Sequence, residues 1–247
     1  ASTTEAQAGV AIEAAEQVLA VLQGRPARYA VNAPLVVPEA LRALEPFVNV
    51  ASVMGKLAIQ LAEGQLQSVL IRYDGEIAKY DTTILKAAVI QGLMAPISEE
   101  RVNMVNVNIV AAQRGLRITE HKQAQDSLHY TSLLTVELST SAGKTVFAGT
   151  SMRNETHIVR INNYWLDLMP TAPYMLFTDH LDRPGLIGAV GGITGAHDIN
   201  ISFMEVGRLE LRGRAMMVLG VDDPVPEAVL REIRAIPHIY AVKVVRL

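Results

Sequence analysis

The sequence predicts an α+β fold made of two different parts, and two patterns lead to this expectation. Up to residue 161, amphipathic helices and short apolar strands follow one another without the strict alternation of a doubly wound parallel sheet. From residue 174 onward the expected order is strand, helix, strand, strand, helix, strand, which is the ferredoxin-like pattern. A mixed α+β domain followed by a ferredoxin-like domain is therefore the predicted architecture of the 247 residues.

The first expected helix starts at the beginning of the sequence. Residues 2–5 read Ser-Thr-Thr-Glu, a capping-box pattern in which a hydroxyl accepts from a backbone N–H three residues on and the glutamate reaches back. Apolar residues then recur at helical spacing until Gly24 and Pro26 end the helix, among them Val10, Ala14, Val18 and Val21. A stripe this broad needs a partner, either the missing remainder of a domain or a neighbouring subunit.

Residues 34–171 are expected to form the mixed domain. Helical periodicity covers residues 38–63, 82–93 and 105–114, and short β-rich runs cover residues 68–73, 116–121, 132–140, 144–151 and 158–161. Residues 141–143 make a hairpin turn between two of these strands. Pro170 and Pro173 mark a boundary, so we expect three segments: a helix and linker at residues 1–33, then residues 34–171, then residues 172–247.

The last segment is expected to be the ferredoxin-like domain. Its strands are predicted at residues 174–178, 199–206, 215–221 and 239–247, and its helices at residues 184–196 and 226–235. A four-stranded sheet that carries both helices on one face leaves its other face and its edges free to pair with another copy. We therefore expect a homo-oligomer.

Composition excludes several classes of protein. The chain carries 22 basic and 25 acidic residues, and its net charge of -3 gives no electrostatic reason to expect nucleic acid or an anionic membrane as a partner. It contains no cysteine, which excludes disulfides, thiolate catalysis and cysteine-bound metals and fits a reducing compartment. No apolar run reaches the roughly 18 residues of a membrane span and no leader opens the chain, so we expect a cytoplasmic protein.

Familiar catalytic motifs are incomplete in this sequence. Residues 143–145 match the end of a phosphate-binding loop, but Leu138 stands where that motif needs its first glycine. The six histidines lack the paired spacing of a metal site, and no G-x-G-x-x-G run follows a strand, so we expect neither a metal nor a dinucleotide fold. Three cations crowd one hairpin, which predicts a solvated tip without function: Arg208, Arg212 and Arg214.

Four glycines lie on the helix expected at residues 184–196. Gly188, Gly191, Gly192 and Gly195 follow the start of the helix, whereas a dinucleotide-binding loop would place its glycines ahead of it. Each glycine costs about 1 kcal/mol of helix propensity relative to alanine. We interpret them as packing residues that let the helix approach a sheet or a second subunit closely.

The loop before that helix has the features of an anion site. Residues 179–185 run from a strand end to a helix whose start is expected at Pro184. The free amides of Gly185, Leu186 and Ile187 would then face outward at the positive end of the helix dipole. A carboxylate fits on such amides.

Asp182 and Asn200 turn this anion site into a candidate site for an α-amino acid. Asp182 offers a counter-charge for an ammonium group near the amides, and Asn200, which opens the next strand, can donate and accept beside it. The other interpretation is that Asp182 only caps the helix and Asn200 only tolerates a tight turn. Spacing alone favours neither.

These residues resemble a known family, and the resemblance extends to both ends of the chain. The run DHLDRPGLI at residues 179–187, followed by INI at residues 199–201, is similar to an ACT domain, a small-molecule sensor, and specifically to the one that ends the long form of D-3-phosphoglycerate dehydrogenase. ASTTEAQ at residues 1–7, with GRP at 24–26 and YAVN at 29–32, resembles the segment that follows the catalytic histidine of that family. Residues 34–170 resemble its intervening, or allosteric substrate-binding, domain in length and place.

The resemblance implies that this chain is the carboxy-terminal, regulatory part of an NAD-dependent enzyme that oxidises 3-phosphoglycerate to 3-phosphohydroxypyruvate in L-serine biosynthesis. Residues 1–33 would end the catalytic domain. The catalytic and nucleotide-binding residues of the family lie upstream, so we expect no catalytic residue and no cofactor in this chain. NAD would belong to the parent enzyme.

The resemblance also carries over an effector site. L-serine would be bound by His180, Asp182 and Asn200 together with the amides around Leu186 and Ile187, in a site normally completed across a two-fold axis between ACT sheets. The expected partners are thus L-serine and a second copy of the chain, without nucleic acid and without a membrane.

One departure from the family concerns the intervening domain. Some long-form members bind an anionic effector with an arginine, a histidine and a second arginine, at positions where this chain has Tyr164, Trp165 and Met169. We therefore expect that anion site to be lost or rebuilt. The basic residues that could rebuild it are Lys122, Lys144, Arg153, His157 and Arg160.

Two alternatives to a serine sensor stay open. The chain could be an oligomerisation module whose serine site is silent, or the small subunit of a bacterial L-serine dehydratase, which pairs a similar intervening domain with an ACT domain. Residues 1–32 and the absence of a serine-rich Ser-His-Thr run speak against the dehydratase.

Overall fold

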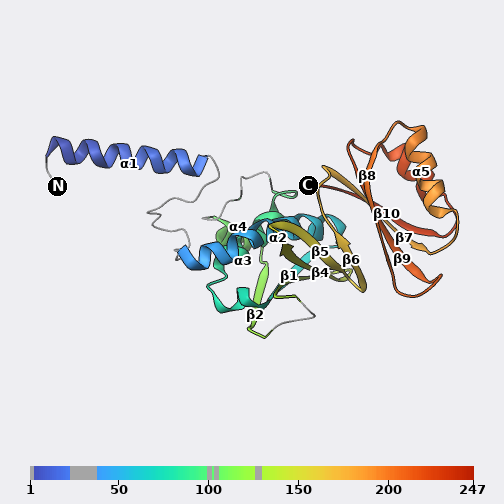
Figure 1. Cartoon of the computed structure of the whole chain (residues 1–247), viewed down its shortest axis with the longest axis horizontal. Helices are drawn as coiled ribbons and strands as arrows, with labels where there is room; N and C mark the ends of the chain where they lie inside the picture. Colours follow the sequence, from blue (N-terminus) through green and yellow to red (C-terminus); the bar gives the residue numbers. More distant parts are fainter. Residues whose placement is uncertain (1–2, 23–37, 99–101, 103–105, 126–129) are drawn as a thin grey trace. The chain divides into compact units, whose positions relative to one another are not determined.

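The computed structural model of the chain describes residues 3–22, 38–98, 102, 106–125 and 130–247. The chain divides into two compact units, Ala1–Leu35 and Val36–Leu247. The first unit contains helix α1 (Thr4–Leu22), drawn in dark blue in Figure 1. Thr3 caps this helix, because its Oγ1 accepts the N–H of Ala6 at 3.3 Å, one residue later than the capping pattern suggested. The helix end expected at Gly24 and Pro26, and the linker expected up to residue 33, lie outside the described residues.

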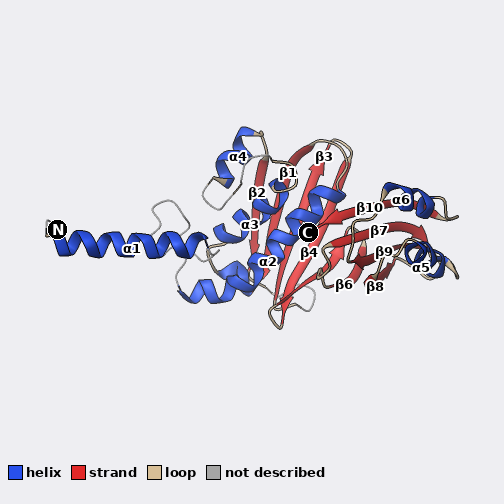
Figure 2. Cartoon of the chain, turned by 90° about the horizontal axis from the view of Figure 1, so that it is seen from above, coloured by secondary structure: helices blue, strands red, loops and turns tan. Residues whose placement is uncertain are grey.

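The second unit begins with a six-stranded sheet that carries helices on one face (Figure 2). Its strands lie in the order β2, β1, β3, β4, β5, β6, and neighbouring strands are antiparallel except β1 and β2, which are parallel. The strands are β1 (Leu66–Gly75), β2 (Arg117–Gln123), β3 (Ser132–Thr140), β4 (Gly143–Met152), β5 (Glu155–Ile161) and β6 (Tyr164–Leu168). The helices are α2 (Pro38–Leu61), α3 (Thr83–Met94) and α4 (Val107–Gln113), with a short 3-10 helix η1 (Glu76–Lys79) after β1.

Strand β6 is the element of this sheet that periodicity did not predict. It has five residues, of which only Tyr164 and Leu168 are buried, so no alternation is long enough to read. The strand forms because the chain turns back directly after β5, and Arg160 of β5 pairs with Trp165. The pairing partner, rather than the local sequence, fixes this element.

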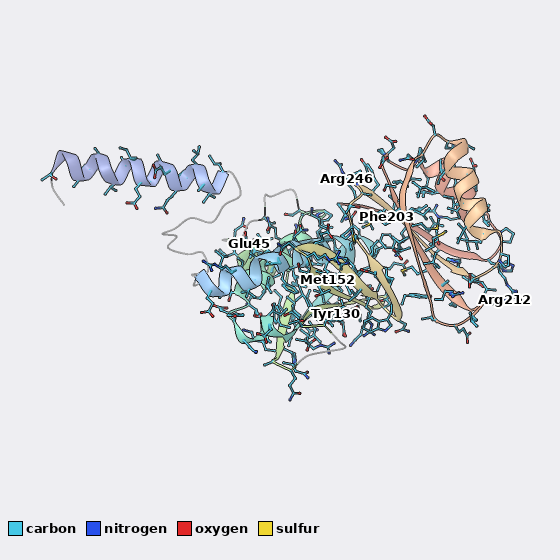
Figure 3. The ribbon with its side chains drawn as sticks, viewed as in Figure 1. Glu45, Tyr130, Met152, Phe203, Arg212 and Arg246 are labelled. Carbon is cyan, nitrogen blue, oxygen red and sulfur yellow. The ribbon has the colours of Figure 1, made fainter. Side chains whose placement is uncertain are left out.

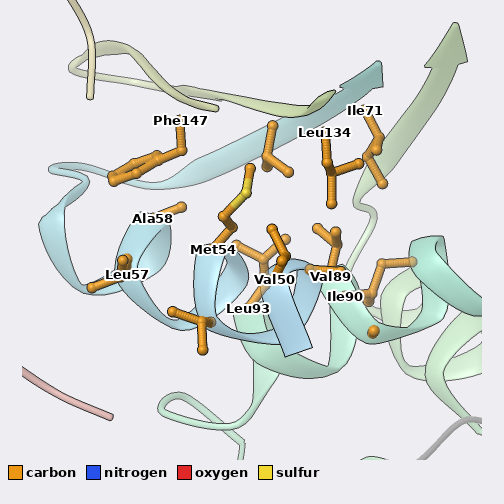
Figure 4. Close-up of a cluster of buried hydrophobic side chains, with 14 of the residues drawn as sticks. Val50, Met54, Leu57, Ala58, Ile71, Val89, Ile90, Leu93, Leu134 and Phe147 are labelled. Atoms are coloured by element: carbon orange, nitrogen blue, oxygen red, sulfur yellow. The ribbon is translucent and has the colours of Figure 1, made fainter. Parts of the chain in front are cut away.

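The core of this domain lies between the sheet and helices α2 and α3. Val50, Met54 and Leu57 of α2 face Ile71 and Phe147 of the sheet, and all five side chains are fully buried (Figure 4). Their burial follows from the two periodicities: every third or fourth residue of α2 and every second residue of β1 points inward. Helix α3 packs beside α2, and its buried residues belong to the same core.

Helices α2 and α3 touch backbone to backbone. A Cβ atom added to Gly92 of α3 would lie 2.1 Å from the carbonyl oxygen of Ser52, and one added to Gly55 of α2 would lie 2.3 Å from that of Val89. Real Cβ atoms do not approach so closely, so only glycine fits at these two positions. The two glycines therefore set how deeply the helices interlock.

The remainder of the second unit is the expected β-α-β-β-α-β domain, which confirms the predicted fold class. The sheet order is β10, β7, β9, β8 with antiparallel neighbours throughout, and Figure 2 shows both helices on one face. The elements are β7 (Tyr174–Leu181), α5 (Leu186–Ala196), β8 (Ile201–Arg208), β9 (Arg214–Val221), α6 (Glu227–Arg234) and β10 (Ile239–Arg246). Among the described helices of the whole chain, none is long and apolar enough to cross a membrane.

Both faces of the four-stranded sheet are covered, so the expectation of a free second face was wrong. Leu176 and Leu219 belong to the cluster under α5 and α6. Their neighbours Met175, Phe177 and Val218 point the other way and join the core of the intervening sheet and its helices. The described residues leave the outer edge of β8 unpaired, and this edge remains for a second copy.

Polar contacts add to this apolar interface between the ferredoxin-like domain and the intervening domain. Arg214 of β9 pairs with Asp179 of β7, hydrogen-bonds to Tyr164 of β6, and lies over the ring of Tyr240 at 4.1 Å. At the other end, Lys243 of β10 donates to the carbonyl oxygen of Leu61 at 2.7 Å. The ferredoxin-like domain is thus fastened to the intervening domain by side chains from several strands.

Candidate ligand site

The candidate site begins with a tight turn between β7 and α5. The N–H of Leu186 donates to the carbonyl oxygen of Arg183 at 3.3 Å, and Gly185 has φ 88° and ψ -16°. Proline followed by a glycine with positive φ is the type II turn. Helix α5 therefore starts at Leu186, two residues later than expected, and the Leu186 amide is not free to bind a ligand.

The first turn of α5 still presents the positive end of a helix. No side chain caps it, which removes the interpretation of Asp182 as a capping residue. Ala189 donates to Gly185, whereas the N–H of Ile187 has no acceptor in the part of the chain that the structure describes. Of the two amides expected to bind the effector, the one of Ile187 is available.

Asp182 is held in place from two sides. Its carboxylate accepts from Nη1 of Arg208 at 3.2 Å, and its backbone N–H donates to the carbonyl oxygen of Gly213 at 2.8 Å. The tip of the β8–β9 hairpin is thereby tied to the loop that precedes α5. The Asp182 side chain is 29% exposed, so solvent still reaches it.

An open pocket of about 520 Å³ lies between that loop and the hairpin. Its charged lining consists of Asp182 and three arginines. The hairpin arginines were expected to form a solvated tip, but Arg208 pairs with Asp182 and Arg214 with Asp179, while Arg212 lines the pocket. Figure 3 shows Arg212 at the far end of the hairpin. The residues that line the pocket are Asp182, Arg183, Pro184, Gly185, Ile187, Arg208, Leu211 and Arg212.

The His180 side chain does not line the pocket. It is 2% exposed, and its Nδ1 lies 3.1 Å from Oγ1 of Thr178. Burial lowers the pKa of the imidazole, while the Thr178 hydrogen bond and the charges of Asp182 and Asp179 oppose that shift. In this chain His180 therefore sits next to Asp182 as a buried neutral side chain, not as an exposed contact.

Asn200 does not lie beside Asp182 in the same chain, contrary to expectation. Asn200 precedes Ile201, whereas Asp182 pairs with Arg208 at the opposite end of β8. A strand rises about 3.3 Å per residue, so the two ends of β8 are about 23 Å apart. Asn200 is exposed and donates to Asp222 at 2.6 Å.

The glycines of α5 have no close neighbour among the residues that the structure describes. A Cβ atom added to Gly188, Gly191, Gly192 or Gly195 would meet nothing within 4 Å. The predicted close approach to the sheet is therefore wrong. The alternative, a close approach to a second subunit, stays a prediction.

The basic residues considered for an anion site in the intervening domain are not gathered into a site. They come from β2, β4, β5 and the turn between the last two strands. Four of them have local partners: Lys122 donates to the Tyr80 carbonyl, Lys144 pairs with Glu137, His157 with Asp167, and Arg160 donates to the Asn162 carbonyl.

The chemistry of the pocket suits a small molecule with both charges. Asp182 can take an ammonium group, and Arg208 with the Ile187 amide can take a carboxylate. Within the described ranges no three metal-ligating side chains come together. The loop sequence alone indicates Asp182 and Ile187. It does not indicate Arg208 and Arg212, because they reach the pocket from a hairpin that is distant in sequence.

Comparison with known proteins identifies the two domains of the second unit. Residues 43–162 match the family model of the D-3-phosphoglycerate dehydrogenase intervening domain, and residues 174–238 match that of the ACT domain. Over 98% of its length the chain is 39% identical to a D-3-phosphoglycerate dehydrogenase of Synechocystis sp., of which it covers 44%.

Two further relatives have lower sequence identity to the chain. Over its whole length the chain is 34% identical to a D-3-phosphoglycerate dehydrogenase of Methanocaldococcus jannaschii and 33% identical to one of Bacillus subtilis, and it covers 47% of each. The chain thus spans less than half the length of these relatives.

Proposed function

The chain belongs to the D-3-phosphoglycerate dehydrogenase family, and from this premise we propose that it is the regulatory, carboxy-terminal part of such an enzyme. The parent enzyme oxidises 3-phosphoglycerate to 3-phosphohydroxypyruvate with NAD in the cytoplasm, the first step of L-serine biosynthesis. This chain binds L-serine through its ACT domain and lowers the activity of the parent enzyme when L-serine is abundant. The pairing of an intervening domain with an ACT domain supports the proposal.

The observation that carries the proposal is the Asp182–Arg208 ion pair on the wall of the pocket. A zwitterion placed between these side chains exchanges one ion pair for two, because its ammonium group binds Asp182 and its carboxylate binds Arg208 and the Ile187 amide. The half-exposed setting makes these pairs stronger than they would be in bulk water. An α-amino acid is the simplest ligand with this charge pattern.

A second copy of the chain completes the site. When two β8 edges pair antiparallel about a two-fold axis through the middle of the strand, Ile201 of one copy comes to lie beside Arg208 of the other. Asn200 of the second copy then reaches the pocket of the first, where it can bind the hydroxyl of L-serine. The exposed apolar residues Met204 and Val206 on β8 and the open glycine face of α5 supply the contact surface.

NAD is a proposal for the parent enzyme only. A dinucleotide needs several glycines ahead of a helix, so that the backbone can approach the pyrophosphate. In this chain α5 follows one such glycine, Gly185, and the other glycines lie within the helix. These residues do not fit the cofactor, and none of them is assigned to it.

Calorimetric titration of the chain with L-serine tests the proposal. The wild type is expected to bind, and Asp182→Ala and Asn200→Ala are expected to lose at least about tenfold in affinity, since each removes a hydrogen bond to a charged or buried group. Asp223→Ala, an exposed aspartate outside the pocket, is the control and should bind as the wild type does. If the wild type gives no heat, or if both site variants titrate as the wild type does, the proposal that the chain senses L-serine is rejected.

A silent site in an oligomerisation module is the second candidate, and the same ion pair favours it. Asp182 already has a positive partner in Arg208, so the charge that an ammonium group would need is neutralised. In that case the chain dimerises, the dimer survives both substitutions, and L-serine produces no heat.

A further inference from the structure

The pocket next to Asp182 carries more positive charge than L-serine can use. Beyond the Asp182–Arg208 pair, its wall contains the guanidinium groups of Arg183 and Arg212. In the part of the chain that the structure describes, neither of these two groups forms an ion pair with a carboxylate, although seven other lysines and arginines outside this pocket do. Two cations thus face the pocket without compensation.

Both arginines are positioned by backbone hydrogen bonds. Arg183 starts the turn that the Leu186 N–H closes on its carbonyl oxygen at 3.3 Å. Arg212 lies at φ 57°, next to Gly213, whose carbonyl oxygen accepts the N–H of Asp182 at 2.8 Å. The loop and the hairpin are therefore tied together, and their cations line one space.

The surroundings add to the positive potential of that space. The uncapped first turn of α5, an eleven-residue helix, points its free N–H groups to the same side as Ile187, which lines the pocket. Ile187 and Leu211 contribute apolar walls, which reduce the screening of the charges by water. A volume of about 520 Å³ also leaves room beyond a ligand as small as L-serine.

We propose that the pocket takes an α-amino acid whose side chain ends in a second anionic group, a phosphomonoester or a carboxylate. The inference rests on the proposed function, because Asp182 and Arg208 hold the ammonium group and the α-carboxylate as they do there. Arg183 and Arg212 bind the distal anion. A phosphomonoester carries roughly two negative charges at neutral pH and compensates both arginines, which the neutral side chain of L-serine does not.

Calorimetric titration of the whole chain with four probes tests this inference: L-serine, O-phospho-L-serine, L-aspartate and inorganic phosphate. At low ionic strength the better of the two anionic amino acids should bind about tenfold more tightly than L-serine, the factor expected for one additional charge-assisted hydrogen bond. Which of the two binds more tightly identifies the distal group as phosphomonoester or carboxylate. Added salt should reduce this preference, because it screens partly exposed charges.

Variants assign the preference to the two arginines. The double substitution Arg183→Gln with Arg212→Gln should bring the anionic ligand within about twofold of L-serine and leave the affinity for L-serine unchanged. Arg231→Gln, an exposed arginine on α6 outside the pocket, is the matched control and should keep the preference. A thermal melt of each variant shows that it is folded.

The outcomes separate this inference from the proposed function. If L-serine binds and neither anionic amino acid binds more tightly, or if the double variant keeps the preference, the inference alone is overturned. If inorganic phosphate displaces O-phospho-L-serine at equal concentration, the amino-acid part is not recognised and the inference is again overturned. If no amino acid binds at all, the proposed function fails with it.

Discussion

At the scale of single residues, burial decides what His180 can do. The side chain is closed off from solvent and rests against Thr178, so its neutral form is favoured although two carboxylates lie nearby. A neutral imidazole offers no positive charge to a carboxylate ligand. The family resemblance names this residue as a ligand contact, and that role stays a prediction; in a single chain the imidazole is buried beside Thr178.

The lowered pKa of His180 predicts a pH dependence of stability. In the unfolded chain the imidazole titrates near its usual value of about 6.5, and in the folded chain it titrates lower. Between these values the unfolded chain binds more protons, so the free energy of unfolding should fall as the pH drops below about 6.5. Urea unfolding of His180→Gln should show a shallower fall than the wild type between about pH 7.5 and about pH 5.5.

His121→Gln is the matched control for that measurement, because His121 is exposed. It should keep the slope of the wild type. Equal slopes for the wild type and His180→Gln would contradict the assignment.

Arg208 distinguishes a responsive site from a silent one. If Arg208 binds the α-carboxylate of the ligand, Arg208→Gln should reduce the affinity for L-serine about tenfold, the usual effect of losing one charged hydrogen bond. The measurement is the same calorimetric titration. An increase in affinity would mean that Arg208 blocks Asp182 in the wild type, as a silent site requires.

At the scale of elements, the crossing of α2 and α3 has no room for an added side chain at either glycine. Each helix presents a glycine to a backbone carbonyl of the other, so no side chain can be added without moving a helix. The helix axes are held there by the surrounding buried residues (Figure 4). This contact should therefore respond to the smallest possible substitution.

Gly92→Ala is predicted to destabilise the protein. The new methyl group would lie 2.1 Å from the Ser52 carbonyl oxygen, and relief of that overlap should cost about 2 kcal/mol or more, which exceeds the gain in helix propensity. Within a single chain Gly191→Ala in α5 has open space around the new methyl group, so in the monomer it should be neutral or up to about 1 kcal/mol more stable. Denaturant unfolding of both variants checks the difference, and equal effects would contradict the close contact.

Elements with a long apolar periodicity were predicted well from the sequence. Elements whose formation depends on pairing with another strand were predicted poorly. Helix α2 and strand β3 each have enough turns or alternations for their ends to be found within a few residues. The parallel pairing of β1 with β2 could not be predicted, because the apolar periodicity of a strand does not indicate which other strand it pairs with. β6 was missed for the same reason.

The part of the candidate site that lies in one loop was predicted from the sequence, and the part that comes from the β8–β9 hairpin was not. Asp182 and Ile187 follow from the chemistry of residues 179–187, which are contiguous. Arg208 lies 26 residues from Asp182 and reaches it only because β8 and β9 fold back as a hairpin. The glycines of α5 were misread because their spacing shows a face of the helix but not whether that face has a neighbour.

At the scale of the whole molecule, the length of β8 separates the two halves of the predicted serine site. Asp182 and Asn200 belong to opposite ends of the same sheet, so one chain cannot bring them together. A two-fold axis at the β8 edge is the simplest operation that does so, and it creates two equivalent sites. Ligand binding and association then depend on each other.

Mixing two defective variants tests whether the site is shared. Asp182→Ala and Asn200→Ala chains each lose both sites of their own dimer. A mixed dimer regains one intact site, so an equal mixture with random exchange should recover about a quarter of the binding sites. The stoichiometry from calorimetry measures this recovery, and a mixture that binds no more than its components would show that the two residues do not meet across an interface.

The face that the ACT sheet shares with the intervening domain also governs how the protein comes apart. Met175 and Phe177 lie in the same buried cluster as Met54 and Leu57 of α2, so neither domain keeps its core when the other unfolds. Residues 36–247 should therefore melt in one cooperative transition, although two family models divide them. Without the intervening domain, the ACT domain would expose this apolar face and become prone to aggregation. We therefore do not expect it to be stable as an isolated domain.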